Sequence, residues 1–255
     1  MKEFKLKIIE PMYYEKEVKV SSDKVSLFFT DEKFADTSIS EIKVEIEGKE
    51  LILPLRVHKI EGAVEDLGGC PLGVYLWGYT GKEYDFMAKC GKDGKFIFYY
   101  PAEKKLRLFI CDRNYAKKHL EYWFTTEGLK DDIEINPVIG NFELWEHKVW
   151  IIPDTIYPIW NVFFVPAIVD KEIPPQLEKE DVKIFTNGKE LEIKEFTSHQ
   201  ICFKGEKEEN YHPAYILSGV MKEQAKKLPP KIMVKIVVHS EKKKIYGEAE
   251  CLIYI

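Results

Sequence analysis

Apolar and polar residues alternate with a period of two over several long stretches of the chain. This alternation buries one face of a strand and leaves the other in contact with water. The alternating stretches are EIKVEIEGKELILPLRV (Glu41–Val57), GKFIFYYP, KLRLFICD, DVKIFTNGKELEIKEF (Asp181–Phe196) and KIMVKIVVHSEKKKIYGEAECLIYI (Lys231–Ile255). The dipeptides between them suit tight hairpin turns: Glu47-Gly48, Asp93-Gly94, Asn187-Gly188 and Ser240-Glu241. The pattern predicts an all-β, mainly antiparallel chain that folds into several β-sandwich domains.

Two segments have a helical character instead. They are YAKKHLEYWF (Tyr115–Phe124) and AYILSGVMKEQAKKL (Ala214–Leu228), the second of which Gly219 interrupts. We therefore expect one or two short helices within the β structure.

The chain of 255 residues is long enough for several small β-domains. The segments EIKVEIEGKELILP at Glu41 and DVKIFTNGKELEIK at Asp181 resemble each other, and a histidine follows each one. Two charged hairpins of a common type would produce much of this similarity by chance, and an internal duplication is the alternative. A polar, acidic stretch, Thr125–Pro137, is the expected linker after the central part. We predict an N-terminal β-region at 1–57, a central β-sandwich at 58–128 and a C-terminal β-sandwich at 129–255.

The central segment has an ordered set of structural motifs. It runs from IEGAVED through GGCPLGVYLWGY and AKCGKDGKFIFYYP to KLRLFICDRNY. It resembles the carboxypeptidase regulatory-like or Cna-B-like family of small transthyretin-like β-sandwiches. The positions that carry the resemblance are Gly62, Val64, Pro71, Leu72, Gly73, Val74, Asp93, Gly94, Phe96, Phe98 and Tyr115. The resemblance implies an accessory module with Asp93-Gly94 at a hairpin tip and Phe96 and Phe98 facing inward. It implies no catalytic group.

Composition and charge exclude some classes of partner. The net charge is −5 and both signs are mixed along the chain, which does not suit a phosphate backbone. The longest apolar run, Trp160–Val169, is half the length of a membrane span. We expect a cytoplasmic protein that binds neither nucleic acid nor membrane. Abundant Lys, Glu and Ile with little Gln and Asn suggest a thermophilic source.

Five cysteines show no CxxC spacing, and an odd number cannot all pair within one chain. We expect reduced cysteines, although Cys90 and Cys111 could face each other across a sheet and form a bridge. No pair of CxxC or HxxxH elements defines a closed zinc site. We therefore predict no structural metal and no cofactor.

Aromatic residues cluster between Asn141 and Ala167. Trp145, Trp150, Tyr157 and Trp160 lie there among several prolines. Aromatic faces stack on the C–H surfaces of sugars, and the same residues also serve as core packing. Residues an odd number apart in a strand face opposite sides, so at least one of the three tryptophans should escape the core. We predict that these four residues bind a ligand. The ligand is either a carbohydrate or a protein partner, and a second copy of the chain is one such partner.

A second candidate lies in the segment SHQICFKGEKEENYHPAYILSG, Ser198–Gly219. We expect this segment to be a loop. If the protein is an enzyme, His199, Tyr211 and His212 are the candidate acid/base groups, and Cys202 could join the histidines around zinc. A packed histidine and a buried cysteine explain the same residues.

Other catalytic signatures are absent from the sequence. It contains no G-x-S-x-G elbow, no phosphate-binding glycine loop and no dinucleotide fingerprint. A working pair of carboxylates could form among the 43 acidic residues, but only the fold decides which of them meet. The leading hypothesis is a non-catalytic binding or assembly protein that recognises carbohydrate through exposed aromatic residues. The alternative is a hydrolase-like enzyme with a site at Ser198–Gly219.

Overall fold

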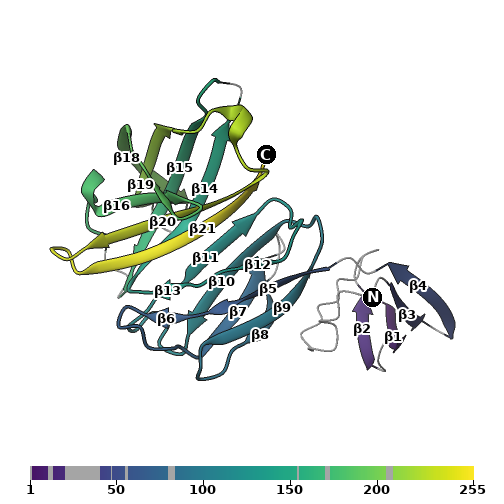
Figure 1. Ribbon diagram of the computed structural model, residues 1–255. Helices are drawn as coiled ribbons and strands as arrows, with labels where there is room; N and C mark the ends of the chain where they lie inside the picture. The colour runs from purple at the N-terminus through teal and green to yellow at the C-terminus, as the bar shows by residue number, and fades with distance from the viewer. Residues whose placement is uncertain are drawn as a thin grey trace. The chain divides into compact units, whose positions relative to one another are not determined.

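The architecture was taken from a computed structural model, which describes residues 2–10, 14–20, 41–46, 48–54, 57–79, 84–153, 155–169, 173–204 and 209–255 (Figure 1). Most of the described residues lie in β-strands, and most of the sheets are antiparallel. The all-β prediction is therefore confirmed. Two compact units form: residues 1–62, 96–104 and 128–135 make the first, and residues 63–95, 105–127 and 136–255 make the second.

The first unit contains two sheets. One has the order β2-β1-β3-β4 and pairs antiparallel throughout, with β1 (Lys2–Glu10), β2 (Tyr14–Val20), β3 (Glu41–Ile46) and β4 (Lys49–Pro54). The other has the order β12-β5-β9, with β5 (Val57–Ala63), β9 (Lys95–Pro101) and β12 (Ile133–Glu134). Phe96 and Phe98 of β9 are buried, and their ring centroids are 6.4 Å apart. The predicted inward orientation of both phenylalanines is confirmed.

The second unit is a β-sandwich of two large sheets. An eight-stranded sheet has the order β17-β16-β20-β21-β11-β10-β7-β8. Its strands are β7 (Val74–Tyr79), β8 (Tyr84–Lys89), β10 (Leu106–Asp112), β11 (Tyr122–Thr126), β16 (Val182–Thr186), β17 (Lys189–Leu191), β20 (Lys231–Ser240) and β21 (Ile245–Tyr254). Adjacent strands pair antiparallel except β11 and β21, which are parallel.

A four-stranded sheet of order β14-β15-β19-β18 forms the other layer. It contains β14 (Phe142–Ile152), β15 (Ile159–Ile168), β18 (Glu195–Lys204) and β19 (Glu209–Val220). One core of buried side chains joins the layers, with Phe142, Trp160, Phe164, Tyr215, Ile184 and Ile236 among them. Two short strands, β6 (Glu65–Asp66) and β13 (Val138–Ile139), pair in parallel beside the sandwich.

Two glycines allow strands to approach one another closely in this core. A Cβ atom on Gly247 would lie 1.8 Å from the carbonyl oxygen of Phe142. A Cβ atom on Gly219 would lie 2.6 Å from Cζ2 of Trp160. Both separations are too short for an alanine, so these positions of β21 and β19 require glycine.

The two segments that we predicted to be helical are not helical over most of their length. Residues 115–124 form turns and then enter β11, while Ala214–Leu228 begins in β19 and contains only a short 3₁₀ helix at Ala225–Lys227. A second 3₁₀ turn spans Lys179–Asp181. Strand pairing along β19 satisfies the backbone of Ala214–Val220, so sheet formation overrides the local helical preference of alanine and leucine.

The turn at Asp93-Gly94 forms, but it does not close a hairpin. Gly94 has a φ of 72°, as the turn requires. The strands on either side, β8 and β9, belong to different sheets and do not pair with each other. The hairpin-tip prediction is therefore corrected: the turn transfers the chain from one sheet to another.

The two similar segments at Glu41 and Asp181 are both hairpins. β3 pairs with β4, and β16 pairs with β17, each around a glycine of positive φ, Gly48 or Gly188. In the second hairpin Asn187 also has positive φ, the requirement of a two-residue type I′ turn. The predicted domain boundaries at 57 and 128 stay predictions, although β12, beyond the second boundary, pairs with β5.

The cysteines whose side chains are described, Cys70, Cys90, Cys111 and Cys251, are free thiols. Cys90 and Cys111 are therefore not bridged. Among the described residues, no helix is both long enough and apolar enough to span a membrane.

Candidate functional site

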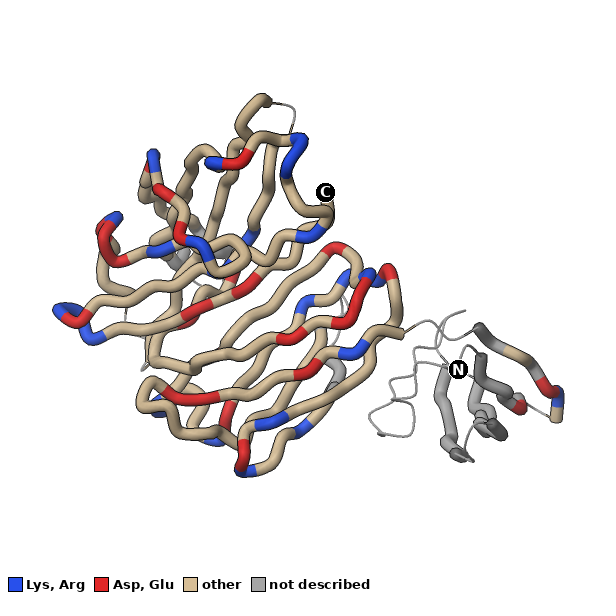
Figure 2. Tube along the Cα trace, viewed as in Figure 1, with Lys and Arg blue, Asp and Glu red and all other residues tan. Residues whose placement is uncertain are grey.

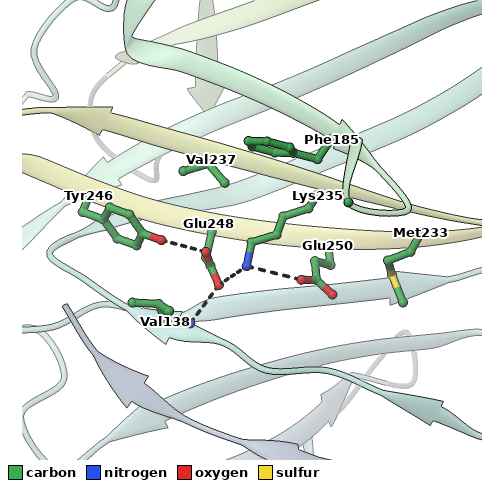
Figure 3. A pocket seen from close by; sticks show the side chains of 9 residues that line it. Val138, Phe185, Met233, Lys235, Val237, Tyr246, Glu248 and Glu250 are labelled. Carbon is green, nitrogen blue, oxygen red and sulfur yellow. Dashed lines mark hydrogen bonds and ion pairs between the residues drawn. The ribbon is translucent and has the colours of Figure 1, made fainter. Parts of the chain in front are cut away.

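A pocket of about 370 Å³ opens on the face of the eight-stranded sheet that points away from the sandwich core (Figure 3). Strands β16, β20 and β21 form its floor, and Val138 of β13 borders it. Its lining combines apolar groups with three charged side chains: Val138, Phe185, Gly188, Met233, Lys235, Val237, Tyr246, Glu248 and Glu250. All of these residues belong to the second compact unit.

The period-two pattern of β20 places Lys235 in this pocket. Ile232, Val234, Ile236 and Val238 are buried in the sandwich core, so the intervening residues point to the opposite face. On β21, Glu248 and Glu250 flank the buried Ala249. The register sets Lys235 directly opposite Glu250, with Phe185 of β16 on the other side of Lys235. An aromatic ring, an ammonium group and a carboxylate therefore follow one another across three strands.

Glu248 has most of its hydrogen-bonding capacity occupied. Its Oε1 accepts from the Val138 amide at 2.8 Å and lies 2.8 Å from Lys235 Nζ. Its Oε2 accepts from the Tyr246 hydroxyl at 2.8 Å. Because three donors converge on this buried carboxylate, Glu248 anchors β13 to β21 and holds the Lys235 side chain in place.

Glu250 is less well compensated. Its Oε1 lies 3.6 Å from Lys235 Nζ, which is longer than a hydrogen bond. The buried Tyr122 hydroxyl also lies near Glu250 and helps to lower the pKa of this carboxyl. Burial raises the pKa of Glu250, while Lys235 lowers it and the charge of Glu248 raises it further. Burial also raises the pKa of Tyr246, with a further contribution from Glu248.

This arrangement offers several kinds of contact to a ligand. Lys235 offers hydrogen-bond donors, Glu250 offers acceptors, and Phe185 offers an aromatic surface in the same pocket. No serine, cysteine or histidine lines it. Within the described part of the chain, no group of three or more His, Cys, Asp and Glu side chains could hold a metal ion.

The four predicted aromatic ligand-binding residues do not line this pocket. Trp160 is buried in the core, and Trp145 is half-buried and packs against the same core. Trp150 and Tyr157 are exposed, at 42% and 46%. The prediction that at least one of the three tryptophans escapes the core is thus confirmed by Trp150. Their role in ligand binding stays a prediction.

The predicted loop at Ser198–Gly219 is instead a β-hairpin of β18 and β19, outside residues 205–208, which the structure does not describe. His212 pairs with Ile201, and His199 pairs with Ala214, which places both imidazoles on one face of the hairpin. Tyr211 pairs with Cys202 and belongs to the opposite face. The hairpin therefore does not bring the three candidate acid/base groups together on one face. The burial of the Cys202 side chain lies outside the described residues.

A pair of carboxyl groups does meet elsewhere in the second unit. Glu121 and Glu143 share a side-chain hydrogen bond, and Glu143 Oε1 accepts from the Trp123 indole at 2.7 Å. Burial raises the pKa of both groups, and for Glu121 the charge of Glu143 is the next cause. Hydrogen-bonded carboxyls are too close for glycoside hydrolysis, which needs at least roughly 5 Å between them. The pair therefore joins β14 to the residue that precedes β11.

Comparison with known proteins gives no family. No family model matches the sequence, and no curated protein matches it. A Bacteroides uniformis structure provisionally described as a carbohydrate binding protein matches 78% of this chain and 99% of its own, with 10% identity and a TM-score of 0.29. The full-length major pilin SpaD of Corynebacterium diphtheriae matches 78% and 67%, with 5% identity and a TM-score of 0.24. A DUF3823 family protein from Bacteroides ovatus matches 78% and 99%, with 12% identity and a TM-score of 0.23. These neighbours are β-sandwich proteins, and the similarity is too low to assign a function.

The pocket residues were missed in the sequence because they come from four separate strands. One signal was present: Glu248 and Glu250 alternate with Ala249 inside an otherwise apolar strand, which places two acids on one face. Inside the opposite strand, Lys235 lies between apolar neighbours. Elsewhere, acidic and basic positions are interspersed along the described trace, so charge alone does not single out the pocket (Figure 2).

Proposed function

We propose that this chain is a non-catalytic carbohydrate-binding β-sandwich protein and that the saccharide occupies the pocket around Lys235. The observation that carries the proposal is the convergence of Phe185, Lys235 and Glu250 in one concavity. A sugar ring has an apolar C–H face and a rim of hydroxyls that both donate and accept hydrogen bonds. Phe185 matches the face, and Lys235 with Glu250 matches the rim.

The dimensions and rigidity of the pocket support a small ligand. A volume of about 370 Å³ lies in the range of small-molecule sites. The floor consists of paired strands, and Glu248 already fixes Lys235 through a 2.8 Å contact. Because these groups are held before the ligand arrives, binding loses little conformational entropy.

Calorimetric titration of the whole protein with a set of neutral mono- and disaccharides tests this function. We expect Phe185→Ala and Lys235→Met each to weaken the affinity by about tenfold or more, since each removes one class of contact. Lys183→Ala is the matched control, because Lys183 lies on β16 but is exposed and does not line the pocket. Equal affinity in the wild type and both pocket variants would overturn the location of the site.

The central segment supports an accessory role. We propose that it belongs with the carboxypeptidase regulatory-like modules, because Phe96 and Phe98 are buried as the resemblance implies. Deletion of the turn residues Asp93-Gly94 should abolish folding of a module that changes sheets there. A variant that retains its near-ultraviolet circular dichroism would contradict this assignment.

A second candidate function, assembly, is favoured by the outer face of the four-stranded sheet. The register aligns Ile152, Ile159 and Val220 in one row, and Trp150, Asn161 and Ser218 in the next. Three apolar members of these rows, Trp150, Ile152 and Val220, are exposed. We propose a second copy of the chain as the partner, because a self-complementary pairing of one face is the commonest form of assembly.

The solution mass tests the assembly proposal. We expect a dimer for the wild type and a monomer for Trp150→Lys, because a lysine introduces a charge into the centre of the interface. Ile156→Lys is the control, since Ile156 is exposed but lies in a turn outside these rows. A monomeric wild type at all accessible concentrations would exclude assembly through this face.

A further inference from the structure

The charges in the pocket do not balance. Two buried carboxylates, Glu248 and Glu250, face a single ammonium group, that of Lys235. Lys235 lies 2.8 Å from Glu248 and 3.6 Å from Glu250, so its closest contact is with Glu248. Glu248 also receives the Val138 amide and the Tyr246 hydroxyl. The uncompensated charge therefore resides on Glu250.

A buried carboxylate that shares its cationic partner with a second carboxylate is costly, and a ligand that brings another positive charge reduces this cost. Burial raises the pKa of Glu250, as expected for a carboxylate that lacks full compensation. The pocket wall also contains Phe185 and Tyr246, whose ring faces attract cations. An anionic ligand is disfavoured, because the only positive charge in the lining already serves two carboxylates.

We propose that the ligand of this pocket carries a protonated amine, as an amino sugar does, and that Glu250 is the residue that receives the ammonium group. This inference rests on the proposed carbohydrate function and names the class of saccharide. Lys235 then holds the hydroxyl groups, while Phe185 contacts the ring.

A matched pair of disaccharides tests the proposal. The glucosamine disaccharide and its N-acetylated counterpart have the same carbon skeleton, but only the first is cationic. We expect the wild type to bind the amine form about tenfold more tightly in calorimetric titrations at a pH where the amine is protonated. Raising the salt concentration should weaken binding of the amine form and leave the acetylated form nearly unchanged, because only the first depends on charge.

Two variants locate the effect. Glu250→Gln keeps the shape of the side chain and removes its charge, so the preference for the amine should disappear while the acetylated form still binds. Glu190→Gln removes an exposed carboxylate of β17 outside the pocket and should leave the preference unchanged. Thermal unfolding shows whether each variant is folded, and the salt series on the wild type requires no variant.

The outcomes separate the two proposals. Equal affinity of the wild type for both disaccharides overturns the amine inference and leaves carbohydrate binding in place. Tighter binding of the amine that persists in Glu250→Gln also overturns the assignment of Glu250. If the protein binds neither these disaccharides nor any neutral saccharide, both the proposed function and this inference fail.

Discussion

At the scale of single residues, the buried imidazole of His147 makes stability depend on pH. Its Nε2 lies 3.1 Å from Thr125 Oγ1, and its Nδ1 lies 3.3 Å from the Leu144 carbonyl oxygen. Burial lowers the pKa of His147 to about 4, and the charge of Arg107 adds to the effect. Between pH 6.5 and 4 the unfolded chain therefore binds more protons at this residue than the folded chain.

We expect this residue to lower the free energy of unfolding as the pH falls through that interval, by up to about 3 kcal/mol. Above pH 6.5 the imidazole is neutral in both the folded and the unfolded chain, so it no longer lowers the free energy of unfolding. Urea denaturation at a series of pH values measures the slope. His147→Gln should flatten the slope between pH 6.5 and 4, whereas His239→Gln, at an exposed position of β20, should not. Identical slopes for the wild type and His147→Gln would contradict the assignment.

Gly219 gives a second prediction at this scale. Its missing side chain leaves room for the Trp160 ring and for the Glu192 carbonyl oxygen, which would lie 2.5 Å from a Cβ atom. Gly219→Ala should therefore destabilise the protein by about 1–3 kcal/mol through overpacking. Gly73→Ala is the control, because its nearest contact would be an ordinary 3.4 Å. Denaturant midpoints compare the two variants, and equal midpoints would refute the close packing.

Sequence reasoning found some of these residues and not others. At least one of the three tryptophans was expected to escape the core, because an odd spacing separates the faces of Trp145 and Trp150, and the structure has Trp150 exposed. Lys235 and Glu250 could not be paired from the sequence, since their contact depends on the register of β20 against β21. A register shift of one residue in either strand would move the side chains of that strand to the other face of the sheet.

At the scale of elements, Glu248 links the short strand β13 to the long strand β21. Removal of its carboxylate leaves the Val138 amide, the Tyr246 hydroxyl and Lys235 without this acceptor. We expect Glu248→Ala to destabilise the protein by about 3 kcal/mol. We also expect faster hydrogen exchange at the Val138 amide.

Glu190→Ala is the matched control for that prediction. Glu190 forms an exposed pair with Lys183 at 3.8 Å, and such pairs contribute about 0–1 kcal/mol. Hydrogen exchange by mass spectrometry and urea denaturation measure both variants. Unchanged exchange at Val138 in Glu248→Ala would show that other contacts hold β13 in place.

The strands themselves were largely predictable, because alternation and turn dipeptides are local signals. Asn187-Gly188 marks the β16–β17 turn in the sequence, and both residues adopt positive φ in the structure. The sheets were not predictable in the same way. The Asp93-Gly94 turn has the sequence of a hairpin, yet β8 and β9 join different sheets, a choice that depends on distant partners.

At the scale of the whole molecule, two groups of buried ionisable residues oppose each other in their pH dependence. His147 favours neutral and higher pH, as argued above. Burial raises the pKa of Glu121 and Glu143, so the folded state binds more protons than the unfolded state above the ordinary carboxyl value of 4.5. The stability that depends on this protonated pair is fully present below pH 4.5. It is lost as the pH rises through the pKa values that the two carboxyls have in the folded state.

We therefore expect a maximum in stability at mildly acidic pH, with a decline on the alkaline side that Glu121→Gln reduces. An amide cannot acquire the charge that repels Glu143, so the variant should exceed the wild type in stability by about 1 kcal/mol at pH 8. Thermal unfolding between pH 5 and 9 measures this difference. A parallel decline in both proteins would assign the alkaline loss to other groups.

The parallel pairing of β11 with β21 governs how the chain can fold. The contact between Val138 and Glu248 spans 110 residues, and the β11–β21 pairing joins segments that are also distant in sequence. Closure of such a long loop carries a large entropic cost, so this step is expected to come late and to be slow. During synthesis on the ribosome, β7, β8, β10 and β11 are the first strands of the eight-stranded sheet to emerge, and one edge of β11 stays unpaired until β21 arrives. That edge is a template for pairing with another nascent chain, so yield on expression should depend on how quickly the last strand is made.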